Sequence, residues 1–510
     1  MSKKEEKSIA VSAVYMGWGI CIALILVLIF FFFDDVYACK QEFANLFLLL
    51  SLGLVVCCGI FIWFMQRKWK ISPRIPILIG LAFMAFQIWL MKYYVFQTGW
   101  DVQGIIMSAW QAARGEVIDA YTFSVYPNNI LLTYIFSRIL RFGTAIGLTE
   151  YHSYDLLLVL QSFLSFLAGL LLFYAIDQVT KKRNFALCGY VIYLMLIGLS
   201  PWVSIPYSDA FGLFFPTAIL ALYLYPAKNR VCSAIKWAGI GFLSWFGYQI
   251  KPTIMIVLIA IGIIDFLSAC KNKKLKLLAM RAFFLAGGIL LSSFAVSFAY
   301  RHFGYEVDPE KTFGPAHFFA MGLNEDSMGI WAAEDVNYSE AVLTAKERTQ
   351  ADLELAKERI TKMGIKGLLR QYKRKLLTNF NDGTFAWAQE GNFFRIILDT
   401  SNEKLAGLIR SFYYTDGSHY KIFLNFEHAI WLVVMVLTFF SCFTEKNKKI
   451  AVIMLTLLGF VLYGLLFEAR ARYVYIFSPF FIILAVLGFC ELRKRVIESQ
   501  SIKMLKGTAR

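Results

Sequence analysis

Long apolar runs recur along the whole chain, and they constrain its fold more than any other feature. A helix needs roughly 20 apolar residues to cross a bilayer, and about twelve runs of that order are present. The chain is 58% hydrophobic and 17% aromatic, which is more apolar content than a soluble core requires. The sequence predicts an all-α polytopic membrane protein with spans near 10–33, 43–65, 75–95, 156–178, 185–203, 210–225, 234–250, 253–269, 280–300, 426–444, 449–467 and 474–490.

The net charge of +16 is distributed as in a membrane protein, so we expect membrane lipids and no nucleic acid as partners. Basic clusters occupy alternate loops, and cytoplasmic loops carry an excess of Lys and Arg. We therefore expect a multi-pass protein of the cell membrane with both termini cytoplasmic and the loop 96–155 and the segment 301–425 extracellular. The basic clusters are Lys3/Lys4/Lys7, Arg67/Lys68/Lys70/Arg74, Lys181/Lys182/Arg183, Lys228/Arg230, Lys271/Lys273/Lys274/Lys276, Lys446/Lys448/Lys449 and Arg493/Lys494/Arg495.

The residues that commonly bind metals show no metal-site spacing. The nine cysteines are scattered, mostly within spans, and we interpret most of them as packing residues. The histidines match no metal motif, and His317 is the strongest candidate among them for lining a site. The five histidines are His152, His302, His317, His419 and His428.

The apolar stretch 127–148 is long enough to span but carries Arg138 and Arg141 in its middle. As a span it would bury two arginines, at roughly 2.5 to 3.5 kcal/mol each, and would reverse the side of the next basic loop. We therefore predict an amphipathic helix in the membrane interface. A shorter one is predicted over 101–114.

Asp101 opens the first long loop, directly after an apolar span and Trp100. Aromatic residues favour the membrane interface, where a lipid-borne substrate could reach the acid. We consider Asp101 the candidate catalytic residue, with Trp100, Tyr126 and Asn128 as possible residues lining the site. The alternative is that Asp101 caps the surface helix that follows it.

The segment 301–425 is the one sizeable polar region of the sequence. Residues 339–374 are rich in Ala, Glu, Lys, Leu and Arg at helical spacing, which predicts a small helical domain or lid. Asn381, Asp382 and Glu390 could touch an acceptor molecule, although a solvated loop is the simpler interpretation.

The order of these parts resembles a known family. A span ending in Asp101, surface helices that start at Tyr126-Pro-Asn-Asn129, a hairpin of spans and then Pro206-Tyr-Ser-Asp209 are similar to the GT-C glycosyltransferases. Within that family the chain looks most like the protein O-mannosyltransferase and aminoarabinose lipid A transferase group (glycosyltransferase family 39-like), especially its Gram-positive cell-surface members. The resemblance covers roughly residues 75–490.

The resemblance implies a GT-C-like bundle of about twelve transmembrane helices with extracellular interfacial helices and a small extracellular helical domain. It also implies an inverting enzyme that moves a sugar from a polyprenyl-phosphate carrier to a cell-envelope acceptor: cell-wall polysaccharide, teichoic acid or protein. Asp101 matches the family's first-loop acid. Many members have two adjacent acids there, whereas Val102 follows Asp101 here, so the divalent metal that the resemblance allows is not supported by a paired acid.

The proposed chemistry requires a base for the acceptor hydroxyl and cations for the departing phosphate. A carboxylate such as Asp101 is ionised at neutral pH. Lys251, Arg470 and Arg472 follow the ends of spans on the expected outer side, and they are the candidate phosphate ligands. The family's late basic motif resembles the two arginines.

Each of these assignments has a simpler alternative. Lys251, Arg470 and Arg472 could extend to lipid head groups. Asp209 could be a second active-site acid or only a helix cap. The competing functions are a transporter or flippase of lipid-linked sugars, which needs no base, and a non-catalytic scaffold.

These features divide the chain into four parts. Two additional N-terminal spans occupy 1–74, and the GT-C-like core with its first extracellular loop occupies 75–300. The extracellular helical domain is 301–425. Residues 426–510 form the last spans and a cytoplasmic tail.

Overall fold

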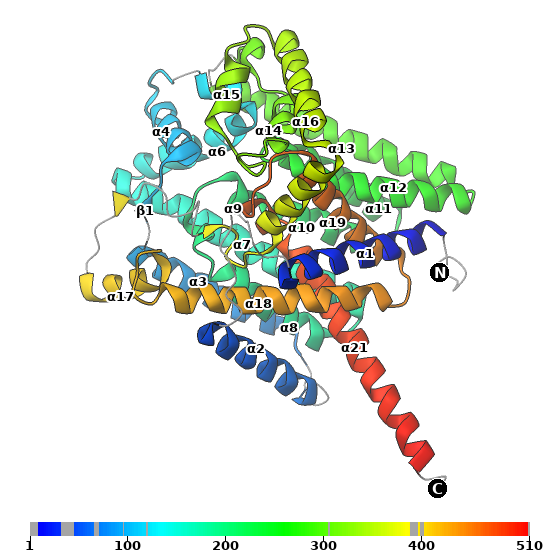
Figure 1. Ribbon diagram of the computed structural model, residues 1–510. Helices are drawn as coiled ribbons and strands as arrows, with labels where there is room; N and C mark the ends of the chain where they lie inside the picture. The colour runs from blue at the N-terminus through cyan, green and yellow to red at the C-terminus, as the bar shows by residue number, and fades with distance from the viewer. Residues whose placement is uncertain are drawn as a thin grey trace.

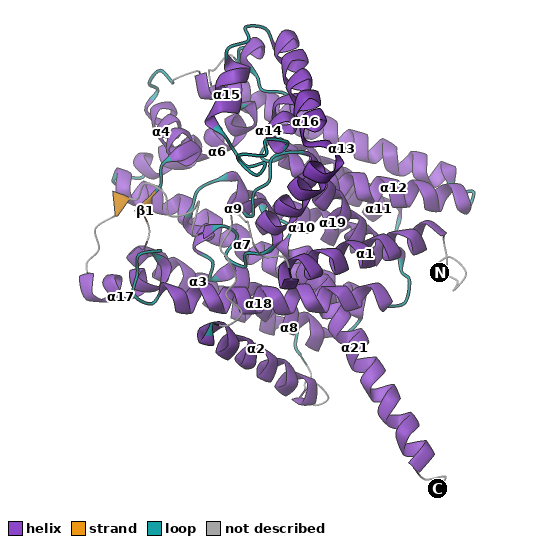
Figure 2. Ribbon diagram, viewed as in Figure 1, coloured by secondary structure: helices purple, strands orange, loops and turns teal. Residues whose placement is uncertain are grey.

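The computed structural model describes residues 9–31, 45–65, 71–94, 96–118, 121–303, 307–387, 396–397 and 402–507. This part of the chain is almost entirely helical (Figures 1 and 2). Its two strands have two residues each, and β1 (Phe96–Gln97) pairs antiparallel with β2 (Ile396–Ile397). Helices predominate because a backbone within lipid must satisfy its hydrogen bonds internally.

Every expected span coincides with a helix. Seven helical segments of the described chain are long and apolar enough to cross a membrane, and three shorter apolar segments accompany them. The prediction of an all-helical polytopic membrane protein is confirmed. The helices at the twelve expected positions are α1 (Ile9–Phe31), α2 (Leu46–Met65), α3 (Arg74–Tyr94), α7 (Glu150–Thr180), α8 (Arg183–Tyr193) with a π-helical turn (Leu194–Gly198), α10 (Phe214–Leu224), α11 (Arg230–Tyr248), α12 (Met255–Lys271), α13 (Leu275–Phe303), α18 (Tyr420–Phe440), α19 (Lys448–Leu466) and α21 (Ser478–Gly507).

The helices differ in how much apolar surface they leave uncovered. Phe283, Phe294 and Phe298 of α13 are 58–74% exposed, which a soluble protein would not tolerate as a group. On α18, by contrast, Trp431 and Met435 are fully buried. A helix that is apolar on all sides is expected where one face meets lipid and the other meets protein.

The start of α1 and two basic turns meet at one end of the bundle. Lys446 donates a hydrogen bond to Ser12 near the start of α1, at 2.9 Å. Lys448 and Arg281 both pair with Asp265, at 2.5 and 2.6 Å. In Figure 1 the start of α1, the α12–α13 turn and the α18–α19 turn all lie on the right. This basic end agrees with the alternation of basic loops in the sequence.

Two shorter helices, α4 (Trp100–Arg114) and α6 (Ile130–Ala145), pack against each other in the loop after α3. The 16 residues of α6 are too few for a span. Its face with Leu132 and Phe136 is buried, while Arg141 is exposed. The Arg138 guanidinium lies 4.9 Å from the ring centre of Tyr134. The helix is amphipathic, as the two arginines predicted.

Three helices of the polar segment pack together, and we call them the α14–α16 cluster: α14 (Pro315–Gly322), α15 (Ala333–Glu340) and α16 (Ala345–Phe380). Ala320, Leu323 and Ala356 form a small core within it. The other short helices are α5 (Tyr121–Val125), α9 (Ser208–Gly212), α17 (Glu403–Tyr413), α20 (Arg472–Tyr475) and the 3-10 turns Pro127–Asn129, Pro201–Ser204, Pro252–Ile254, Pro309–Lys311 and Ser441–Phe443.

The last residues of α16 and the residues that follow it pack into the main core of the helix bundle. Leu377, Phe380 and Trp387 are at most 1% exposed, and Phe380 packs against Phe481 of α21. The boundary between polar helices and bundle therefore falls inside the segment 301–425.

Candidate functional site

Asp101 lies in the first turn of α4, and its side chain contacts Tyr207, which is far away in the sequence. The Tyr207 hydroxyl donates a hydrogen bond to its Oδ2 atom at 2.9 Å. Gly99 takes the N-cap position of α4, so Asp101 is not the cap. Trp100 has a φ of +46°, which is uncommon for a bulky residue, and its indole donates to Thr98. This constrained turn holds the acid beside Tyr207.

Two residues after Tyr207, Asp209 binds two cations. It is 1% exposed and lies in the first turn of α9. The Lys251 ammonium binds its Oδ1 atom, and Arg472 donates from Nη1 to Oδ2 at 2.7 Å. Lys251 precedes the 3-10 turn at Pro252, and Arg472 begins α20. One carboxylate thus joins three segments that are far apart in sequence.

Aromatic rings surround both cations. The Arg472 guanidinium lies 5.0 Å from the ring centre of Trp100 and 5.3 Å from that of Tyr207. The Lys251 ammonium lies 4.3 Å from the ring centre of Tyr473. Such contacts stabilise cations, most strongly where water is excluded. Because both side chains are at most 9% exposed, they do not extend to lipid head groups.

Arg470 is held by a separate acid. Its Nε atom donates to Glu468 Oε1 at 2.9 Å, and the Tyr473 hydroxyl donates to Oε2 at 2.7 Å. Burial by itself would raise the pKa of Glu468, but Arg470 and Arg472 together hold it below its usual value. Glu468 is therefore ionised and balances the charge of Arg470.

The structure thus brings together six of the sequence candidates. They are Trp100, Asp101, Asp209, Lys251, Arg470 and Arg472, and we call this group the charged site. Sequence analysis gave no role to Tyr207, Glu468 or Tyr473, which connect these six. Only their positions in the sequence could have suggested a role, since Tyr207 lies within Pro206-Tyr-Ser-Asp209 and Glu468 and Tyr473 flank the arginines.

Three candidates contact other parts of the chain. Tyr126 packs against Phe313 with ring centres 5.6 Å apart, and Asn128 donates to Asn129 at 3.2 Å. His317 is 1% exposed and shares a hydrogen bond with Ser339 at 2.7 Å. Burial lowers the pKa of His317 to about 4, so its imidazole is neutral at physiological pH.

Asn381 and Asp382 are fully buried rather than solvated. Asp382 accepts hydrogen bonds from the backbone N–H groups of Thr384 and Ala386, at 2.8 and 2.9 Å. Phe385 and Ala386 have φ values of +55° and +62°, so these bonds support an unusual turn. Glu390 lies outside the described residues.

The described residues contain no group of three or more His, Cys, Asp or Glu side chains that could hold a metal ion. Val102, which stands where many GT-C members have a second acid, is 2% exposed.

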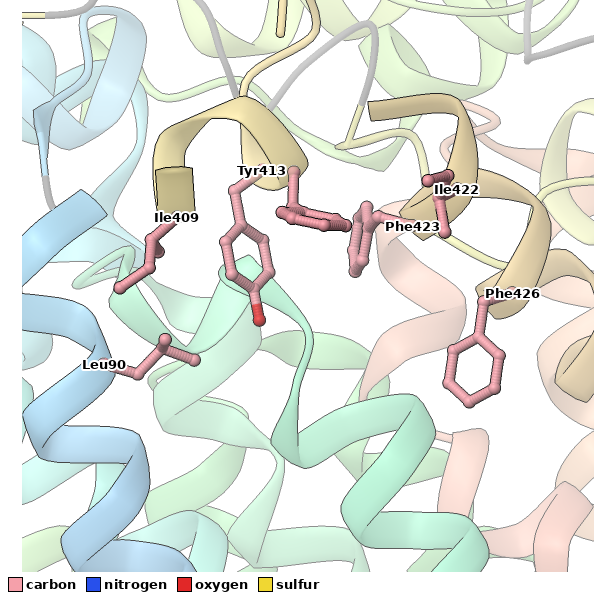
Figure 3. A pocket seen from close by; sticks show the side chains of 7 residues that line it. Leu90, Ile409, Tyr413, Ile422, Phe423 and Phe426 are labelled. Atoms are coloured by element: carbon pink, nitrogen blue, oxygen red, sulfur yellow. The ribbon is translucent and has the colours of Figure 1, made fainter. Parts of the chain in front are cut away.

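An apolar cavity of about 280 Å³ lies between α3, α17 and α18 (Figure 3). Leu90, Ile409, Phe412, Tyr413, Ile422, Phe423 and Phe426 line it. The Trp387 indole donates to the Tyr413 carbonyl at 2.8 Å and packs on Phe96. None of the charged candidates lines this cavity, so it is a feature separate from the charged site.

Comparison with known proteins gives a family for the chain. No curated protein matches the sequence. A solved structure, the archaeal oligosaccharyltransferase AglB from Archaeoglobus fulgidus in complex with an inhibitory peptide and a dolichol-phosphate, aligns with 12% identity and a TM-score of 0.37. The alignment covers 86% of this chain and 52% of that one, so the chain spans about half the length of AglB. A family model described as conserved hypothetical integral membrane protein matches residues 23–491, and the chain belongs to this family.

Proposed function

We propose that the protein is an inverting glycosyltransferase that moves a sugar from a polyprenyl-phosphate carrier to a cell-envelope acceptor. One observation carries the proposal. Lys251 and Arg472, which lie 42 and 263 residues from Asp209 along the chain, meet on its carboxylate, and Tyr207 connects this group to Asp101. A potential base and phosphate-binding cations then lie in one buried, aromatic site.

Asp101 is the general base of the proposed reaction. Burial and the nearby Asp101 raise the pKa of Tyr207, so the phenol stays protonated and donates to the carboxylate. Tyr207 thereby orients one oxygen of Asp101, and the other takes the proton of the acceptor hydroxyl. The acceptor oxygen attacks the anomeric carbon from the face opposite the phosphate, which inverts its configuration.

The cations serve the leaving group. As the bond between the anomeric carbon and the phosphate oxygen breaks, the electron pair stays with the polyprenyl phosphate, whose charge grows. The carboxylate of Asp209 already holds Lys251 and Arg472 in place before the carrier phosphate arrives. Preorganised cations of this kind stabilise a developing anion without reorganising during the reaction. Arg470, two residues before Arg472, is the third candidate ligand.

The proposed site faces the outside of the cell, with the basic end in the cytoplasm. The α14–α16 cluster and the α4–α6 pair then lie on the acceptor side, where a polysaccharide, teichoic acid or protein would approach.

Asp101→Asn tests the catalytic assignment. The amide can still accept the Tyr207 hydrogen bond but cannot take a proton, so we expect the protein to fold and transfer to fall by at least about 100-fold. The assay combines purified protein with radiolabelled polyprenyl-phosphate hexoses and cell-envelope membranes, and measures released polyprenyl phosphate. A flippase needs no base, so near-normal transfer by a folded variant would reject Asp101 as the base. Lipid movement without any transfer by the wild type would support the flippase.

A further inference from the structure

Lys375, near the end of α16, is a completely buried lysine. Its ammonium group donates to three backbone carbonyls: Gly322 at 3.0 Å, Leu465 at 2.7 Å and Phe467 at 2.6 Å. An ammonium group has three N–H donors and no acceptor, so three carbonyls satisfy it fully. Burial lowers the pKa of Lys375 to about 7, and the three hydrogen bonds compensate for the burial of its protonated form.

The three carbonyls come from two segments that are far apart in sequence. Gly322 ends α14, whereas Leu465 and Phe467 lie at the end of α19 and just beyond it. A fourth bond joins the same segments, because the Ala469 N–H donates to the Gly329 carbonyl at 2.8 Å. The loop after α19 is therefore fastened to the α14–α16 cluster through its backbone.

The two segments approach so closely that a side chain at Gly322 has no room. A Cβ atom there would lie 2.6 Å from the Phe467 carbonyl oxygen and 2.8 Å from the Lys375 ammonium nitrogen. Such distances require something to shift, and two of the three nearest atoms belong to the Phe467 backbone. The close contact between the α14–α16 cluster and the loop after α19 therefore requires glycine at position 322.

The fastened loop leads directly into the charged site. Phe467 immediately precedes Glu468, which holds Arg470, and Arg472 follows two residues later. Small displacements of this loop would move both arginines relative to Asp209. An apolar side chain could fill the same space without the cost of burying a charge. A lysine with three specific partners instead fixes the loop in one arrangement.

We propose that Lys375 is a positioning residue, which completes the phosphate-binding site by fastening the loop of Arg470 and Arg472 to the α14–α16 cluster. The site is then fully formed only when the cluster is docked. The role in phosphate binding rests on the proposed function, whereas the fastening of the loop does not.

Lys375→Met tests the proposal, because methionine keeps much of the volume and removes all three donors. The matched control is Lys366→Met, an exposed lysine of the same helix. Hydrogen–deuterium exchange of residues 465–471 reports the loop, and titration with farnesyl phosphate reports the phosphate site. We expect faster exchange in Lys375→Met and affinity lower by roughly tenfold to 100-fold, since misplacement of about 1 Å can have such effects. In transfer assays the KM for donor should rise more than kcat falls.

Gly322→Ala disrupts the same contact without removing Lys375, because the added methyl group separates the two segments. It should reproduce both effects, and it serves if Lys375→Met does not fold. The proposal would be overturned if Lys375→Met and the control Lys366→Met showed equal hydrogen exchange in the loop, or if they bound farnesyl phosphate with equal affinity. If the wild type does not bind farnesyl phosphate, the proposed function fails, and hydrogen exchange alone decides whether Lys375 fastens the loop.

Discussion

Asp209 pairs with two buried cations of the charged site, and its own side chain is 1% exposed. Lys251 and Arg472 are at most 9% exposed, so water compensates little of their charge. A buried charge that loses its partner is far more costly than an exposed one. The pairing also orders the cations before any ligand arrives.

Asp209→Asn should therefore destabilise the protein by about 3 to 5 kcal/mol, because two cations would share a neutral amide. The control is Glu150→Gln, which breaks the pair with Arg114. Those side chains are 62% and 43% exposed, so its cost should be at most about 1 kcal/mol. Thermal unfolding in detergent compares the variants. Equal melting temperatures would mean that the Asp209 pairs contribute no more than a surface pair.

At the scale of elements, α16 links the polar helices to the bundle through a break in its own helix. Gly364 has a φ of +58° and a ψ of −173°, a conformation that is essentially restricted to glycine. Space around it is open, so the backbone alone requires the glycine. The break separates the first part of α16, which contains Ala356 of the small core, from the part that carries Lys375.

The same substitution at two glycines should have opposite effects. Gly364→Ala strains the break and should destabilise the protein by about 1 to 3 kcal/mol. Gly407 is exposed within α17, has no neighbouring atom within 4 Å of an added Cβ, and should gain about 0.5 to 1 kcal/mol as alanine. Chemical unfolding of both variants measures the difference. A stabilising Gly364→Ala would show that the break is not required.

At the scale of the whole molecule, charge separates the two ends of the bundle. The start of α1, the α12–α13 turn and the α18–α19 turn are joined at the basic end (Figure 1). Asp101, Lys251 and the loop after α19 lie at the far ends of their spans. A membrane placed between these ends would keep the basic loops on one side and the charged site near the other.

This arrangement predicts that residues on both sides of α6 face the same compartment. Cysteines placed at Asn128 and Thr149 should both react with an impermeant maleimide added outside intact cells. The unmodified protein, which has nine natural cysteines, gives the background. Labelling at only one of the two positions would mean that α6 crosses the membrane, and every later segment would change sides.

Sequence by itself determined the class of protein, because hydrophobic length and the alternation of basic loops are local properties. The twelve expected spans fall on helices for this reason, and the arginines of α6 predicted a surface helix. Asp101 was also found locally, as an acid at the end of a span. The sequence could propose Lys251 and Arg472 as cations near one face, but not their partner.

Only the tertiary structure decided how these residues meet. The bond from Tyr207 to Asp101 joins residues 106 positions apart, and that from Arg472 to Asp209 joins residues 263 apart. The polar segment 301–425 gave no sign that residues 376–387 enter the core or that Lys375 holds the loop after α19. Such pairings depend on how the helices pack against one another, and hydrophobic periodicity records which face of a helix is buried but not what it is buried against.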